Sequence, residues 1–278
     1  MIGQENLKRI VEEWIDNDLF PRFSIFVGPR GSGKKTLVRE VIKSLTDGMY
    51  VESGIRADDI REIIAQSYKV HSLAVYFIPD ADKMSNAAKN ALLKVIEEPP
   101  NNAYFIMTLE DEANTLPTIL SRGIVFKMER YTPYDIADYF YDKHHANHGE
   151  DEEQIAKSLC DTPGEVDILV KMGIKEFYDY VQLVVDNIVE VSLANAFKIA
   201  SKISLKDGAE GYDLRLFWKA FIKVVLEKAL NHMNIEDISQ YSEAVMKTSK
   251  YLQRLRVASI NRGMLFDNWI LEIRDCFK

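Results

Sequence analysis

The chain has 278 residues, of which 47% are hydrophobic and 28% charged, a balance typical of a folded globular protein. Its formal net charge of −8 argues against a protein that coats nucleic acid by itself, because neutralising phosphates requires clustered Lys and Arg. Every apolar run is shorter than the roughly 20 residues that cross a bilayer, so we expect no membrane partner and a cytoplasmic location.

The first part of the chain alternates helical and strand patterns. Residues 4–17 carry apolar side chains at helical spacing, and residues 23–27 are a short apolar run that ends at a glycine, as in a buried strand. Further helices are predicted at 34–44, 57–67, 85–97 and 113–121, and further strands at 73–78, 103–108 and 124–128. Because nearly apolar strands alternate with helices, we predict an α/β fold with a doubly wound parallel sheet.

After this α/β part the strand patterns stop. A helical pattern follows, interrupted by the polar stretch 144–153, by Asp161–Glu165, and by breaks near 207–211 and 231–237. We therefore expect three domains: a nucleotide-fold domain at 1–131, a small helical lid at 132–173 and an all-helical domain at 174–278.

The strand at 23–27 leads into a loop that fits the phosphate-binding pattern G-x-x-x-x-G-K, in the strand–loop–helix context that this pattern requires. Its glycines, Gly28, Gly31 and Gly33, allow backbone amides to turn toward phosphate oxygens, and Lys34 would reach the outer phosphates of ATP. Two alternatives stay open, a loop that binds ATP and a nucleotide-type fold that holds no nucleotide.

The next residue is Lys35, where such loops place a Ser or Thr whose hydroxyl binds Mg²⁺. An ammonium cannot ligate a cation, and Thr36 lies about 100° further round the helix, which makes it a poor substitute. After the strand at 73–78, Pro79 occupies the position of the metal-binding acid and Asp80 that of the water-orienting acid. That Asp80 takes the metal role is an open alternative, but we do not expect Mg²⁺ to be held well or ATP to be hydrolysed efficiently.

Four stretches carry a more specific signal. They are IGQENLKRIVEEW before the loop, DADKMSNAAKNALLKVIEEPP at 80–100, YFIMT at 104–108 and LPTILSRG at 116–123. Together they resemble the clamp-loader branch of the AAA+ proteins, and most closely the delta-prime type of subunit of bacterial DNA polymerase III. The likeness covers the α/β domain and continues beyond it only as a helical pattern.

The resemblance implies roles for single residues. Arg122 would act as an arginine finger in the ATP site of a neighbouring subunit, with an ordinary surface arginine as the alternative. Gly123 replaces the Cys that the family usually has after this arginine. Thr108 matches the family's first sensor, with a turn-capping hydroxyl as the alternative. The second sensor, an Arg in the family, is absent here, where Glu165 is found.

No metal is expected in this chain. The four-cysteine zinc module of many family members is absent, and Cys160 and Cys276 lie far apart, which predicts reduced thiols. His144, His145 and His148 lack the glutamate of an H-E-x-x-H motif, so we interpret them as part of a solvated polar loop rather than a metal site.

The resemblance also implies partners and a function. The C-terminal helices would be the collar that joins a pentameric ring of clamp-loader subunits, which contacts the sliding clamp and primer-template DNA. We expect a subunit that supports ATP-driven loading of the clamp and has little or no ATPase of its own. Two alternatives remain: an active AAA+ ATPase of DNA replication or repair, with Asp80 and Thr36 holding Mg²⁺, and a non-enzymatic scaffold of another DNA-repair or phage assembly.

Overall fold

The computed structural model describes residues 3–188, 192–204, 211–231, 235–255 and 260–277. The chain forms two compact units, the first made of Met1–Asp135 with Thr162–Gly164 and the second of Ile136–Asp161 with Glu165–Lys278. Most of the region expected to be the lid is therefore grouped with the C-terminal helices, and a separate lid remains a prediction.

The first unit is built on a five-stranded parallel sheet with the order β2-β3-β4-β1-β5. The strands are β1 (Phe23–Val27), β2 (Met49–Glu52), β3 (Ala74–Ile78), β4 (Ala103–Leu109) and β5 (Ile124–Lys127). The predicted α/β fold class is confirmed. Because β1 lies between β4 and β5, the loop that follows β1 emerges at the sheet's carboxyl edge, between the ends of these two strands.

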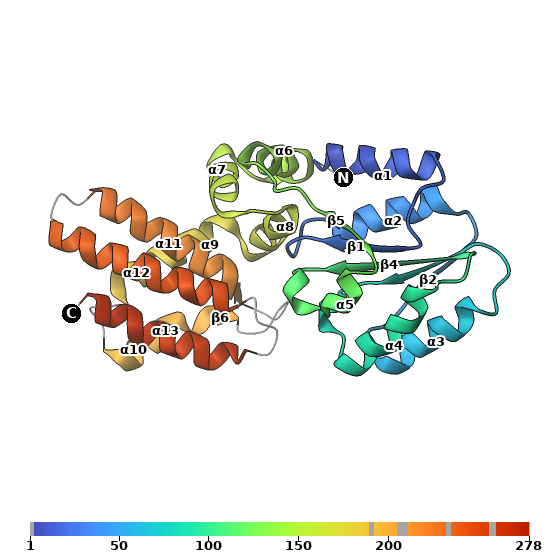
Figure 1. Ribbon diagram of the computed structural model, residues 1–278. Coiled ribbons are helices and arrows are strands. Elements are labelled where there is room, and N and C mark those ends of the chain that lie inside the picture. Colours follow the sequence, from blue (N-terminus) through green and yellow to red (C-terminus); the bar gives the residue numbers. More distant parts are fainter. Residues whose placement is uncertain (1–2, 189–191, 205–210, 232–234, 256–259, 278) are drawn as a thin grey trace. The chain divides into compact units, whose positions relative to one another are not determined.

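Helices cover both faces of this sheet (Figure 1). They are α1 (Glu5–Asp16), α2 (Lys34–Leu45), α3 (Ala57–Ser67), α4 (Asn86–Glu97) and α5 (Pro117–Leu120), with 3₁₀ turns η1 (Ala81–Lys83) and η2 (Glu112–Asn114). Helices α1 and α2 share one core cluster with one face of the sheet, and α3, α4 and α5 share a second cluster with the other face. The helix predicted at 113–121 is split, because a residue that precedes a proline, here Leu116, disfavours helical backbone angles.

The second unit is mainly helical. Its helices are α6 (Pro133–His144, which begins in the first unit), α7 (Glu150–Leu159), α8 (Pro163–Met172, which also begins there), α9 (Ile174–Asn187), α10 (Leu193–Ile199), α11 (Leu214–Asn231), α12 (Ile235–Arg254) and α13 (Arg262–Cys276), with 3₁₀ turns η3 (His145–Asn147) and η4 (Ala200–Lys202). The apolar side chains of α11 form part of the core: Phe217, Trp218 and Phe221 are almost fully buried and pack with Trp269.

Two expectations for this unit need correction. The C-terminal part is not all-helical, since β6 (Ile203–Ser204) pairs with β7 (Tyr212–Asp213). Glu150 to Glu153, expected in a polar loop, form the first turn of α7, where acids are favoured by the helix dipole. The predicted break near 207–211 lies, except for Gly211, outside the described residues, as do 232–234 of the break near 231–237.

In the part of the chain that the structure describes, no helix combines the length and apolar content needed to span a bilayer.

Candidate functional site

The phosphate loop joins β1 to α2 and depends on its three glycines. Gly31 and Gly33 both have φ of +80°, a backbone conformation that other residues adopt only with strain. At Gly28 a Cβ atom would lie 2.6 Å from the side chain of Met128, so only glycine fits. The loop therefore has the backbone of a phosphate cradle that leads into the amino end of α2 at Lys34.

Lys34 is buried inside this loop. Its Nζ donates hydrogen bonds to the carbonyl oxygens of Gly28 at 2.6 Å and Pro29 at 2.8 Å. Burial lowers the pKa of Lys34, and the nearby carboxylates of Glu110 and Asp82 only partly oppose that shift. The side chain that would bind phosphates is thus engaged with the carbonyls of its own loop.

Lys35 forms an ion pair with the candidate acid of the site. Its Nζ lies 2.9 Å from Asp80 Oδ2, and the Nζ of Lys83 lies 3.4 Å from the same oxygen. Burial alone would raise the pKa of Asp80, but the hydrogen bonds and charges of these two lysines outweigh it and hold that pKa below its ordinary value. The carboxylate is therefore ionised and already neutralised by protein cations.

Thr108 fixes the backbone of the same acid. The amide of Asp80 donates a 3.0 Å hydrogen bond to Thr108 Oγ1, and Asp80 has a positive φ of 52°. This contact joins the ends of β4 and β3 and supports the turn that follows β3. Thr36, by contrast, lies exposed on α2.

These residues do not fit a Mg²⁺ site. Lys35 is a cation where a hydroxyl ligand is needed, Pro79 carries no ligand atom, and the carboxylate of Asp80 is engaged with two ammonium groups. Among the described residues, no group of three or more His, Cys, Asp or Glu side chains could hold a metal ion. His144 and His148 instead lie 3.0 Å from the carboxylates of Asp167 and Glu152.

A segment distant in sequence packs on the loop. The amide of Gly164, at the start of α8, donates a 3.0 Å hydrogen bond to the carbonyl oxygen of Gly31, and Thr162 Oγ1 donates one of 3.2 Å to that of Arg30. A Cβ atom at Gly164 would lie 2.5 Å from Gly31 Cα, so the two backbones touch. The only signal of this contact in the sequence is the Pro163-Gly164 pair, which predicts a break between helices and does not predict the contact.

Glu165 has a structural position in the second unit. It is 8% exposed, and its carboxylate accepts hydrogen bonds from the amide of Asp161 at 2.8 Å and from Nζ of Lys219 at 2.7 Å. At the position where the family's second sensor was expected, the chain therefore has a buried acid paired with a lysine of α11.

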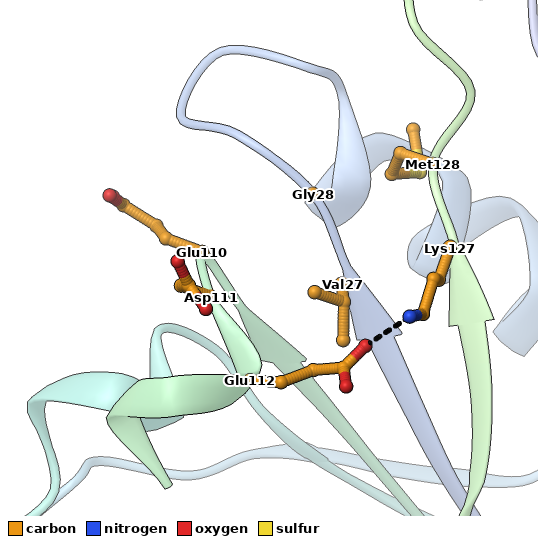
Figure 2. A pocket seen from close by; sticks show the side chains of 7 residues that line it. All are labelled: Val27, Gly28, Glu110, Asp111, Glu112, Lys127 and Met128. Atoms are coloured by element: carbon orange, nitrogen blue, oxygen red, sulfur yellow. Dashed lines mark ion pairs between the residues drawn. The ribbon is translucent and has the colours of Figure 1, made fainter. Parts of the chain in front are cut away.

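An open pocket of about 370 Å³ lies beside the first glycine of the loop (Figure 2). It is lined by Val27, Gly28, Glu110, Asp111, Glu112, Lys127 and Met128. Lys127 is paired with Glu112 at 2.7 Å, the contact drawn dashed in Figure 2, which leaves an excess of carboxylates on this face. Such a surface repels phosphate groups, so the pocket is not where a nucleotide's phosphates would bind.

Arg122 lies at the surface, after α5. Its Nη1 donates a 2.7 Å hydrogen bond to the carbonyl oxygen of Thr118, and its Nη2 pairs with Glu97 at the end of α4. Its side chain is 32% exposed. At Gly123 a Cβ atom would lie 2.7 Å from the ring of Phe23, which explains why glycine replaces the expected cysteine.

The structure thus brings most of the predicted site residues together. Lys34, Lys35, Asp80 and Thr108 surround the glycine loop, whereas Thr36 and Arg122 take no part in this network.

The parallel sheet with a phosphate loop after its first strand is that of a P-loop AAA+ protein. Two solved structures have a similar fold. A DNA polymerase III gamma subunit-related protein from Thermotoga maritima gives a TM-score of 0.52 at 18% identity and covers 99% of both chains. The RuvB Holliday junction branch migration motor of the same organism gives a TM-score of 0.52 at 16% identity and covers 99% of this chain and 87% of its own.

Sequence comparisons indicate which AAA+ proteins this chain resembles. Residues 50–132 match the family model described as DNA polymerase III, delta subunit. DNA polymerase III subunit gamma of Buchnera aphidicola is 28% identical over 50% of this chain and 47% of its own length. DNA polymerase III subunit delta' of Haemophilus influenzae is 39% identical over 25% of this chain and 21% of its own length. The replication factor C small subunit of Halobacterium salinarum is 26% identical over 46% of this chain and 43% of its own length. The α/β domain is therefore similar to clamp-loader subunits of the AAA+ class, and the matches span less than half the length of these relatives.

Proposed function

We propose that the chain is a delta-prime-like clamp-loader subunit of a DNA polymerase III holoenzyme. It supports ATP-driven loading of the sliding clamp onto primed DNA and donates Arg122 to the ATP site of a neighbouring subunit. The observation that carries this proposal is the 2.9 Å ion pair between Lys35 and Asp80. A protein ammonium takes the place of the metal on which phosphoryl transfer depends, so the chain's own loop is not expected to catalyse hydrolysis.

The role of Arg122 follows from its chemistry and exposure. A guanidinium presented to the transferred phosphate stabilises the charge that spreads over its oxygens, an effect worth ~10³–10⁵ in rate in nucleotide hydrolases. The partly exposed side chain of Arg122 is held by acceptors of α4 and α5, which supports a role toward a ligand on another subunit.

The proposal also includes nucleotide binding by the chain's own phosphate loop. The positive-φ glycines fit a phosphate, and the fully buried Ser32 has an Oγ with no hydrogen-bond partner among the described residues. However, Gly164 packs on Gly31, and Lys34 is bonded to loop carbonyls. We propose that ATP enters only when these contacts open, and that it binds there without Mg²⁺.

The remaining parts of the proposal concern assembly. Relatives with named subunit roles support membership in a multi-subunit complex. We propose a nucleotide-fold domain at 1–131, a lid at 132–173 and a collar at 174–278 that joins the other subunits of a pentameric ring in the cytoplasm. The sliding clamp and primer-template DNA would be contacted through that assembly.

The second candidate is a catalytically active AAA+ ATPase of DNA replication or repair. The intact glycine geometry of the loop and the presence of Lys34 favour it. This alternative requires Asp80 to release Lys35 and ligate Mg²⁺ together with Thr36.

ATP hydrolysis by the purified chain separates the two candidates. A clamp-loader subunit of the proposed kind shows negligible hydrolysis alone, with or without Mg²⁺, whereas an active ATPase hydrolyses ATP by itself and loses that activity in EDTA. Mg²⁺-dependent turnover by the isolated chain would contradict our proposal.

A further inference from the structure

We infer that Glu97 is a positioning residue for Arg122: its carboxylate orients the guanidinium that we propose acts on a neighbour's ATP. This inference rests on the proposed function of Arg122. It concerns the contact between the end of α4 and the residues that follow α5.

The backbone on both sides of Arg122 is fixed by the core. Ile119 of α5 is fully buried, and at Gly123 the chain passes so close to Phe23 and Ile25 that a Cβ atom would lie within 3 Å of either side chain. The Cα of Arg122 therefore has little freedom to move. The direction in which the guanidinium points depends on the contacts of the side chain itself.

Two acceptors determine that direction. The Thr118 carbonyl oxygen binds Nη1, and the Glu97 carboxylate binds Nη2. A guanidinium has five N–H donors in a rigid plane, so two fixed donors set the orientation of the plane and three donors remain for a ligand. Removing Glu97 would leave one acceptor, which fixes the position of one guanidinium nitrogen but not the orientation of the guanidinium plane.

The location of Glu97 is unfavourable for the helix alone. It is the last residue of α4, at the negative end of the helix dipole, and another acid, Glu98, follows at the C-cap. A sequence that breaks a local rule in this way often does so at a functional position. The cation of Arg122 offsets the unfavourable charge at Glu97.

The pair can orient Arg122 without holding it back. Both side chains are partly exposed, 32% for Arg122 and 48% for Glu97, and exposed ion pairs are weak. A triphosphate with several negative charges can therefore compete for the guanidinium. Glu97 restricts the conformations of the Arg122 side chain until the phosphates of a neighbour's ATP bind it.

The test uses the loader reconstituted with the ATP-hydrolysing clamp-loader subunits of the same organism. We expect Glu97→Ala to lower kcat for ATP roughly 10-fold with KM unchanged, the size typical of lost supporting contacts. Glu97→Gln keeps an acceptor oxygen in the same place and should restore most of kcat. Glu98→Ala removes the neighbouring exposed charge and should leave kcat unchanged.

A double substitution tests whether Glu97 affects kcat through Arg122. On an Arg122→Ala background, Glu97→Ala should cause no further loss, because its only role in turnover is through Arg122. A wild-type kcat for Glu97→Ala, or an equal loss on both backgrounds, overturns the inference and leaves the finger intact. If Arg122→Ala itself has no effect in the assembled complex, the proposed function fails instead.

Discussion

The backbone amide of Gly164 donates a hydrogen bond of 3.0 Å to the carbonyl oxygen of Gly31, so that the start of α8 rests directly on the phosphate loop. Neither position tolerates a side chain, because the added Cβ of Gly164 would lie 2.5 Å from Gly31 Cα. The shape of the loop therefore depends on a segment more than 100 residues further along the chain, as well as on its own glycines.

Substitution of Gly164 should destabilise the first unit. Gly164→Ala forces a methyl group into backbone atoms, and overpacking of this kind costs about 1–3 kcal/mol. The measurement is urea-induced unfolding of the whole chain. Gly149→Ala, where a Cβ meets nothing within 4 Å, is the matched control and should cost less than about 1 kcal/mol. Equal effects at both positions would contradict the close contact.

The Lys35–Asp80 ion pair predicts a pH-dependent contribution to stability. The pKa of Asp80 is lowered in the folded protein, so the pair stabilises above the carboxyl's ordinary pKa of 3.8, and this contribution is lost as the pH falls through the lowered value. Lys35→Ala should cost about 1 kcal/mol or less, since both side chains are partly exposed.

Unfolding of wild type and Lys35→Ala at neutral and acidic pH checks this sign. The difference between them should be the same at about pH 7 and pH 5 and smaller near pH 3. Lys43→Ala, an exposed lysine on the same helix, should show no such trend. A Lys35→Ala difference that grows toward acid would refute the assigned ionisation of Asp80.

Nucleotide binding should be insensitive to Mg²⁺. Lys35 and Pro79 stand where the metal's hydroxyl and carboxylate ligands are required, so a fluorescent ATP analogue should bind equally in Mg²⁺ and in EDTA. The double substitution Lys35→Thr with Pro79→Asp supplies both ligand types and should make binding stronger in Mg²⁺ than in EDTA. Tighter binding of wild type in Mg²⁺ would favour the active-ATPase alternative.

Lys219 should be essential to the second unit. Its side chain is 15% exposed and pairs with Glu165, so Lys219→Met leaves a buried acid without its cation, at a cost of about 3 kcal/mol. Burial would lower the pKa of Lys219, but Glu165 and Asp161 outweigh it and raise that pKa, so the contribution persists below pH 10.5 and is lost only as the pH rises through the raised value.

Urea unfolding measures this effect, with Lys250→Met, an exposed lysine on α12, as the control. The control should change stability by less than about 0.5 kcal/mol. If the two variants unfold alike near neutral pH, Lys219 does not have the structural role assigned to it.

The sheet was largely predictable because its central strands are continuous apolar runs. Strand β1 lies at the predicted residues, and β3, β4 and β5 differ from the predicted strands by one residue at an end. Strand β2 was missed, since its four residues alternate between half-buried and exposed positions at the sheet edge. An edge strand of this kind gives neither a long apolar run nor a strong turn signal.

The site was predictable as a set of residue types but not as a set of contacts. The substitutions at Lys35 and Pro79 were visible in the sequence, yet the pairing of Lys35 with Asp80 joins residues 45 positions apart. The contacts of Glu97 with Arg122 and of Gly164 with Gly31 likewise depend on tertiary packing. Motif spacing carries no information about such pairs unless the fold is known.

The most direct test of the central claim is the ATPase activity of the assembled loader carrying Arg122→Ala. If Arg122 completes a neighbour's site, that site should lose ~10³-fold or more in rate while the complex assembles normally in gel filtration. Lys94→Ala, an exposed cation on α4, should leave the rate unchanged. A correctly assembled Arg122→Ala complex that hydrolyses ATP at the wild-type rate would contradict the account.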